Sequence, residues 1–469
     1  MSSSTNRFER TNPFNGSVAS VTHAASIKEA LATVNAAKAA FPAWSAMGPH
    51  ARRAVLLKAA DLLEARRSQF IEINQAETGA TAPWIGFNVS IGAKILREAA
   101  SMTTQIAGEV LPSEKPGAFS TGIRQPAGVC LGIAPWNAAI ILGVRAIAMP
   151  LACGNTAILK ASEMSPQTHT MIVQTLLDAG IPKGVVSVIS HDPKDAPTIV
   201  EALIRSPAIR RVNFTGSTGV GKVIAKLCAE ELKPCLLELG GKAPFIVLDD
   251  ADLEGAVNGA AFGSFMNMGQ ICMSTERIIV TQGIADQFIS ALAKKTAALP
   301  AGDPAGANVL GSLVSQQAVD RLSALVDDAV QKGASVIAGG NNNGTVFEAT
   351  LVDGVTPDMR LYSEESFGPV KPIIRVDNAE HAIEVANDTE YGLSGAIYTS
   401  NIKQGMALAA QLESGICHIN GPTVADEPQA PFGGVKASGI GRFGGKAGIA
   451  EFTDLRWITI EDPQQSYPF

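Results

Sequence analysis

Between Gly128 and Gly241 the sequence alternates short apolar runs with longer amphipathic segments, and this pattern restricts the possible folds more than any other feature. The apolar runs are residues 129–135, 156–160, 185–190, 210–216 and 235–241. Segments with helical spacing separate them at residues 165–179, 196–205 and 219–231. Strands that alternate with helices predict a mostly parallel sheet with helices on both faces, whose ligands bind beyond the carboxyl ends of the strands.

A second run of this kind starts near Phe245, where Asp249 or Asp252 is a candidate helix cap. It predicts helices at 256–268 and 285–298 and strands at 276–281 and 396–400. The N-terminal third instead predicts helices at 26–40 and 50–78. At ~150 residues per domain, a chain of 469 residues has room for about three domains. We therefore predict an α/β fold with two doubly wound, mostly parallel-sheet domains.

Composition excludes several classes of protein. The formal charge of −7 is spread along the chain without a basic block, so nothing predicts a nucleic-acid or anionic-membrane partner. The most apolar region, 129–160, is interrupted by prolines, asparagines and an arginine and does not predict a membrane span. The polar N-terminus predicts no secretory signal. Six cysteines without CxxC spacing predict neither a metal site nor disulfides and favour a reducing cytoplasm.

Three side chains are candidates for chemistry. Glu238 ends an apolar run before two glycines; burial there would raise its pKa toward that of a general base. Asn137, in APWNAA, can stabilise an oxyanion, although its spacing alone favours a turn. Cys272, in GQICMS, is a nucleophile or a small core residue, and composition alone favours the second.

Two further motifs follow predicted strands and suit a nucleotide. The glycine-rich turn FTGSTGVG, residues 214–221, leads into a helix whose N-terminus can bind phosphate. An ordinary turn capped by Ser217 fits it equally well. Lys160 and Glu163, in LKASE, can bind ribose hydroxyls, and the carboxylate would repel a 2′-phosphate. A solvated charge pair is the alternative for them.

Seven motifs together resemble the NAD(P)-dependent aldehyde dehydrogenase superfamily, from about Asn12 to Thr459. They are PWN (135–137), LKASE (159–163), FTGS (214–217), LELGGK (237–242), GQICMS (269–274), EESFGP (364–369) and PFGGVKASG (431–439). The resemblance implies that Cys272 attacks the aldehyde carbon, Asn137 and the Cys272 N–H hold the oxyanion, and Glu238 activates the water that hydrolyses the thioester. The presence of Glu238 favours release of a free acid over transfer to coenzyme A.

The resemblance also implies a nicotinamide cofactor. The residues expected to bind it are Trp136, Lys160, Glu163, Gly216, Ser217, Glu365 and Phe367. Glu163 favours NAD over NADP, although the family contains users of both.

The segments 137–156 and 420–439 look most like the salicylaldehyde, benzaldehyde and vanillin dehydrogenase branch, which implies an aromatic aldehyde substrate. An aliphatic aldehyde or semialdehyde is the alternative. The residues expected to line the substrate pocket are Trp84, Ile140, Ile141, Arg145, Ile271, Met273 and Phe432. Arg145 could bind a ring hydroxyl or a carboxylate, or form an interhelical salt bridge. Ala425 stands where His is more usual, and the smaller residue would widen or depolarise the tunnel mouth.

The family's domain plan assigns residues 1–107 and 125–239 to an NAD-binding domain and 240–450 to a catalytic domain. Residues 108–124 and 451–469 then form a small β oligomerisation arm. In the family this hairpin pairs with the C-terminal strand of another subunit, and the segment 452–460 is predicted to be a strand. The resemblance thus implies a homodimer or homotetramer.

Overall fold

Six strands form the first large sheet of the computed structural model, which describes residues 6–469. Their order is β19-β9-β8-β5-β6-β7, and all pairs are parallel except β19 with β9. The strands are β5 (Val129–Ile133), β6 (Thr156–Lys160), β7 (Val186–Ile189), β8 (Ile209–Thr215), β9 (Cys235–Glu238) and β19 (Gly439–Ile440). Each predicted strand of this region is present, shifted by a few residues at most.

Helices cover both faces of this sheet because successive side chains of each strand point to opposite sides. On β5, Val129, Leu131 and Ile133 pack with three helices on one face, whereas Cys130 packs with the others. The first face carries α1 (Ile27–Ser45), α7 (Ala196–Arg205) and α8 (Thr218–Glu230). The second carries α2 (Pro49–Ala65), α3 (Arg67–Thr78), α4 (Ala82–Met102), α5 (Ala139–Ala152) and α6 (Pro166–Asp178).

The helix predicted over residues 50–78 is two helices, α2 and α3. Arg66 leaves helical geometry at φ −92° and ψ 12°. Its guanidinium reaches α6, where it donates hydrogen bonds to Thr175 and Asp178. Neither Gly nor Pro marks this break, so the local sequence gives no signal for it.

The second large sheet has the order β12-β15-β16-β11-β10-β17-β18, parallel except for β12 with β15. Its strands are β10 (Ala243–Val247), β11 (Thr275–Thr281), β12 (Ser335–Ala338), β15 (Thr350–Asp353), β16 (Val370–Val376), β17 (Ser394–Tyr398) and β18 (Ile416–Ile419). Its helices are α9 (Leu253–Phe265), α10 (Gln282–Ala297), α11 (Gln316–Gln331), α12 (Arg360–Ser363), α13 (Ala379–Asn387) and α14 (Ile402–Ala409). Asp252 is the cap of α9, since its side chain accepts from Gly255 N. The predicted α/β class is confirmed.

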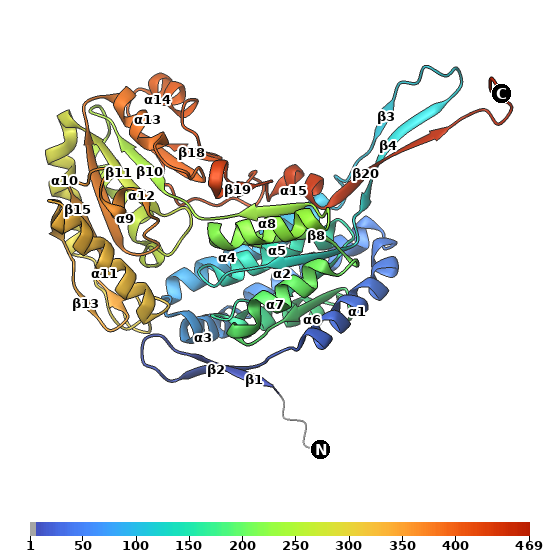
Figure 1. Ribbon diagram of the computed structural model, residues 1–469, viewed down its shortest axis with the longest axis horizontal. Helices are drawn as coiled ribbons and strands as arrows, with labels where there is room; N and C mark the ends of the chain where they lie inside the picture. The colour runs from blue at the N-terminus through green and yellow to red at the C-terminus, as the bar shows by residue number, and fades with distance from the viewer. Residues whose placement is uncertain (1–5) are drawn as a thin grey trace.

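A three-stranded sheet projects from the body of the molecule and carries the C-terminus near its tip (Figure 1). It consists of β3 (Glu109–Leu111), β4 (Phe119–Pro126) and β20 (Thr453–Ile460). Within this chain, β20 pairs along its whole length with β4. Its other side has no neighbouring strand within residues 6–469, so the expected pairing with another subunit stays a prediction. The two strands are each eight residues long and run antiparallel in continuous register.

Shorter elements complete the chain. They are β1 (Arg7–Thr11), β2 (Val18–His23), β13 (Asn342–Asn343), β14 (Val346–Phe347) and α15 (Gly445–Glu451). The domain boundaries stay a prediction, and β19 extends the first sheet although its residues lie in the range assigned to the catalytic domain. Within residues 6–469, no helix is both long and apolar enough to span a bilayer.

Candidate active site

Two cavities meet at Cys272, between the two large sheets. One is mostly apolar and is walled by α5, α9 and the segment 424–432. The other lies at the carboxyl ends of β8 and β9 and is lined by Glu238, Glu365 and the turn before α8. Asn137 and Cys272 line both cavities. A group bound to the sulfur is therefore reached from two sides.

The loop before Cys272 has an unusual backbone. Asn267, Met268 and Gly269 have φ of 48°, 56° and 68°, and two consecutive non-glycine residues in this region store strain. A Cβ on Gly269 would lie 2.2 Å from the carbonyl oxygen of Gly368, so this position requires glycine. The next residue, the buried Gln270, is held in place by a hydrogen bond of 3.1 Å that its Oε1 accepts from Val314 N. The strained loop is thus held by specific contacts.

Asn137 is oriented by the same loop. Its Nδ2 donates to the backbone carbonyl oxygen of Gln270 at 2.9 Å, and its second N–H has no partner among residues 6–469. The backbone carbonyl oxygen of Asn137 accepts hydrogen bonds from Trp84 Nε1 at 3.1 Å and from Asn267 Nδ2 at 3.0 Å. The backbone N–H of Cys272 makes no hydrogen bond within residues 6–469. Two donors beside the thiol are therefore available to an anionic oxygen.

Glu238 ends β9 inside the second cavity. Its side chain is 1% exposed, and neither carboxyl oxygen has a hydrogen-bond partner within residues 6–469. Burial raises its pKa to about 7, an effect that the Cys272 thiol and Arg145 partly offset. Burial and the neighbouring Glu238 carboxyl raise the pKa of Cys272 well above its usual range. Glu238 is close enough to influence the thiol, although no hydrogen bond joins them. Of Glu238 and Cys272, Glu238 is therefore the proton acceptor whose pKa suits neutral pH.

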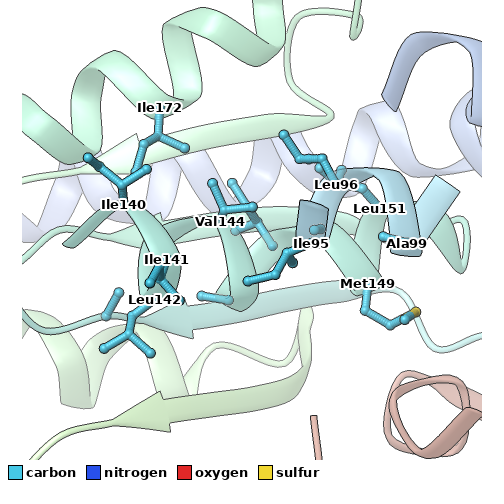
Figure 2. Packing of buried hydrophobic residues seen from close by; sticks show 14 of the residues in the cluster. Ile95, Leu96, Ala99, Ile140, Ile141, Leu142, Val144, Met149, Leu151 and Ile172 are labelled. Carbon is cyan, nitrogen blue, oxygen red and sulfur yellow. The ribbon is translucent and has the colours of Figure 1, made fainter. Parts of the chain in front are cut away.

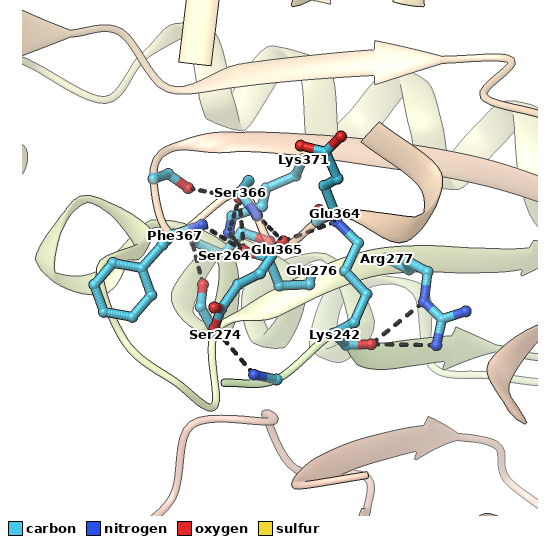
Figure 3. Close-up of polar contacts among 12 residues, drawn as sticks. Lys242, Ser264, Ser274, Glu276, Arg277, Glu364, Glu365, Ser366, Phe367 and Lys371 are labelled. Carbon is cyan, nitrogen blue, oxygen red and sulfur yellow. Dashed lines mark hydrogen bonds and ion pairs between the residues drawn. The ribbon is translucent and has the colours of Figure 1, made fainter. Parts of the chain in front are cut away.

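A buried charge cluster positions the loop of Glu365 (Figure 3). Glu276, on β11, pairs with Lys242 Nζ at 2.9 Å and Lys371 Nζ at 3.0 Å. It also accepts hydrogen bonds from the backbone N and Oγ of Ser366 at 2.7 and 2.6 Å. Burial opposes its ionisation, but the two lysines outweigh it and lower its pKa to about 2. The cluster thus anchors the residue next to Glu365.

Glu365 faces the second cavity. Its Oε1 accepts from Gly241 N at 3.0 Å, and burial, reinforced by the Glu276 charge, raises its pKa to about 7. The neighbouring Phe367 meets Trp136 edge to face at 5.8 Å between ring centroids. Glu365, Phe367 and Trp136 all line the cavity.

Gly216 and Ser217 line the same cavity where α8 begins. The Ser217 Oγ accepts from Val220 N at 3.5 Å, so Ser217 is the helix cap. Lys160, the last residue of β6, and Glu163, just beyond it, form an ion pair and do not line this cavity. Burial alone would raise the pKa of Glu163, but Lys160 lowers it overall. They are therefore a partly buried pair rather than a solvated one.

The apolar cavity is lined by six of the seven residues expected there: Trp84, Ile141, Arg145, Ile271, Met273 and Phe432. Ile140 does not line it. It points toward Ile172, away from Ile141 and Leu142 (Figure 2), and its Cγ2 packs against Gly92 on α4. Neighbouring residues on a helix point about 100° apart, so the adjacent Ile141 faces the cavity while Ile140 faces the core.

Arg145 forms a buried ion pair with Asp426, on a loop rather than on another helix. Asp426 was missed by the sequence analysis, as were Arg321 and Thr215, which line the second cavity. The buried cluster around Glu276 was also missed. The one signal for it in the sequence was Glu276 itself, a charged residue within an apolar strand. Within residues 6–469, no three His, Cys, Asp or Glu side chains gather as metal ligands.

Comparison with known proteins agrees with this geometry. The model of the aldehyde dehydrogenase family matches residues 1–458. A vanillin dehydrogenase of Pseudomonas fluorescens is 59% identical over 98% of this chain and 96% of that protein. A salicylaldehyde dehydrogenase of Pseudomonas putida is 48% identical over 100% of this chain and 97% of that protein.

The crystal structure of a salicylaldehyde dehydrogenase from Pseudomonas putida G7, complexed with salicylaldehyde, has a TM-score of 0.98 to this structure. That protein is 48% identical, and the match covers 100% of this chain and 97% of that one. The resemblance seen in the seven motifs is therefore confirmed. This chain belongs to the aldehyde dehydrogenase family and is an oxidoreductase.

Proposed function

We propose that this enzyme oxidises an aromatic aldehyde to the carboxylic acid with NAD, through a thiohemiacetal and a thioester on Cys272. The observation that carries the proposal is the position of Cys272 between an apolar cavity and a second cavity with two buried carboxyl groups. A substrate ring fits the first cavity and a cofactor the second.

In the first step the Cys272 sulfur attacks the aldehyde carbon. The thiol must first give up its proton to solvent, and the Glu238 carboxylate, with a pKa of about 7, stays ionised for the last step. The carbonyl oxygen becomes an anion beside the free N–H groups of Asn137 and Cys272. Losing one such donor typically costs ~10²–10³ in rate.

The second cavity has the donor set that a dinucleotide requires. The N-terminus of α8, at Gly216 and Ser217, suits a pyrophosphate, and the Glu365 carboxyl suits the hydroxyls of a ribose. Trp136 and Phe367 supply flat apolar surface. A nicotinamide bound there would supply the acceptor for the hydride that the thiohemiacetal carbon loses as the thioester forms. We further propose that Glu163, beyond β6, accepts hydrogen bonds from the other ribose; its carboxylate would repel a 2′-phosphate, which favours NAD over NADP.

In the last step Glu238 takes a proton from water, which attacks the thioester. Both carboxyl oxygens lack a hydrogen-bond partner among the described residues and are therefore available to that water. The product is the free acid.

The apolar cavity supports an aromatic substrate. Its volume of about 240 Å³ lies just below the ~300–1,000 Å³ usual for small-molecule sites, which favours a single ring. Trp84, Phe87, Phe262 and Phe432 contribute aromatic walls. The vanillin and salicylaldehyde dehydrogenases that the chain resembles are named for one-ring aldehydes.

An aldehyde panel tests this proposal by NADH absorbance at 340 nm. We expect kcat/KM to be highest for benzaldehyde, salicylaldehyde or vanillin and lower for hexanal and succinate semialdehyde. An equal or higher value for hexanal would reject the aromatic substrate while leaving the aldehyde chemistry intact.

The β arm supports the proposal of a homodimer or homotetramer. Val110, Leu455 and Trp457 are 73%, 64% and 71% exposed on it, and apolar side chains at this level of exposure suit an interface between copies.

All six cysteines are free, in keeping with the predicted reducing cytoplasm.

A further inference from the structure

A buried ion pair lies in the wall of the apolar cavity, and none of the steps proposed above uses it. Nη2 of Arg145, on α5, donates to Asp426 at 2.6 Å to Oδ1 and 2.5 Å to Oδ2. The two side chains are 7% and 8% exposed, and both line the cavity with Cys272. Hydrophobic residues of similar size often stabilise a fold at least as well as a buried ion pair. Stability alone therefore does not account for it.

The surroundings fix the guanidinium and leave Asp426 as its counterion. Arg145 Cζ lies 4.3 Å from the centroid of the Phe432 ring and 5.9 Å from that of Phe443. Within residues 6–469, every hydrogen bond of the Arg145 side chain goes to Asp426, and no other carboxyl lies within 4 Å. The positive charge in the cavity wall is thus balanced by one residue.

Other acids near Arg145 do not replace Asp426. Glu98 and Glu427 line a separate small cavity behind Arg145 and Phe432, and Glu238 lies beyond Cys272 in the second cavity. None of them pairs with Arg145. Without Asp426, an unpaired cation would face the aldehyde site.

We propose that Asp426 is a specificity-determining residue that cancels the charge of Arg145, so that the cavity accepts uncharged aldehydes and rejects those carrying a carboxylate. The inference rests on the proposed function, because it places the aldehyde in this cavity. An unpaired guanidinium in a water-poor site attracts a carboxylate strongly and can bind it with two parallel hydrogen bonds. The paired guanidinium offers no net charge, and Asp426 repels the incoming anion.

Two substrates of nearly equal shape test the proposal: 4-carboxybenzaldehyde carries a charge and 4-nitrobenzaldehyde does not. The readout is the ratio of their kcat/KM values, charged over uncharged. We expect a low ratio for the wild type and a rise of ~10-fold or more in Asp426→Asn. The Coulomb attraction between the unpaired Arg145 guanidinium and a substrate carboxylate in contact with it, inside a protein, is large enough to produce such a rise. Asp426→Ser should give a rise in the same direction.

Two further variants isolate the charge from the fold. The double variant Arg145→Met with Asp426→Asn removes both charges and should return the ratio toward the wild-type value. Glu427→Gln removes an acid from the adjacent position, outside the cavity, and should leave the ratio unchanged. A ratio that stays raised in the double variant contradicts the proposal.

An unchanged ratio in both single variants, or an equal loss of activity on both substrates, would overturn the specificity role and leave a merely structural pair. If the wild type oxidises neither these aldehydes nor benzaldehyde, the proposed function itself fails. The two failures are therefore distinguishable.

Discussion

Replacing Glu238 with glutamine removes the proposed general base while keeping the size of the side chain. In the folded enzyme the buried carboxyl has a pKa raised from 4.5 to about 7. Hydrolysis of the thioester needs the ionised form, so activity should be gained as pH rises through about 7 and lost as it falls. From the pKa alone, about one-tenth of Glu238 is ionised at pH 6 and about nine-tenths at pH 8.

The wild-type kcat, where hydrolysis limits it, should therefore fall by about tenfold from pH 8 to pH 6. Glu238→Gln should slow hydrolysis by ~10²–10⁴ and abolish this acidic limb. Hydride transfer precedes hydrolysis, so stopped-flow absorbance at 340 nm should show a rapid burst of about one NADH per active site and then a slow phase.

Glu254→Gln is the matched control, because it makes the same chemical change at an exposed position in the first turn of α9. It should keep the wild-type rate and pH profile. A Glu238→Gln enzyme with wild-type turnover, or one whose acidic limb persists, would refute the assignment of Glu238 as the base.

Two other predictions follow from the site geometry. Asn137→Ala should lower kcat by ~10²–10³ by removing an oxyanion donor, measured as steady-state NADH production; a change confined to KM would contradict this role. Ile140→Val and Ile141→Val form a matched pair. The first should cost ~0.5–1.5 kcal/mol of stability, measured by urea unfolding, without changing the KM for benzaldehyde, whereas the second should change that KM. An altered KM in Ile140→Val alone would contradict the placement of these two side chains.

Much of the fold was predictable because each of the five parallel strands of the first sheet is a short apolar run between breaks. Asp252 was one of two candidate caps, and the structure decides between them. The break at Arg66 was not predictable, since tertiary contacts with α6 hold it and neither Gly nor Pro marks it. The pairing of β20 with β4 of its own chain was not predicted, because strand pattern does not say which segment supplies the neighbouring edge; the expected pairing of β20 with another subunit stays a prediction.

The site was predictable where motifs carry it and unpredictable where long-range contacts carry it. Every residue of α5 from Ala139 to Ala152 is buried, so periodicity cannot tell which isoleucine faces the cavity. Asp426 lies 281 residues from Arg145 in sequence, and no local pattern connects them. The hydrogen bond that orients Asn137 is accepted by the backbone carbonyl of Gln270, an acceptor that any residue type could supply.

The central claim is that Cys272 carries the acyl group during aldehyde oxidation. It is tested most directly by mass spectrometry of Glu238→Gln, quenched in acid during the slow phase with benzaldehyde and NAD. We expect one benzoyl group per chain, released by hydroxylamine and located on the peptide that contains Cys272. An unmodified Cys272 peptide in enzyme that has completed its NADH burst would contradict it.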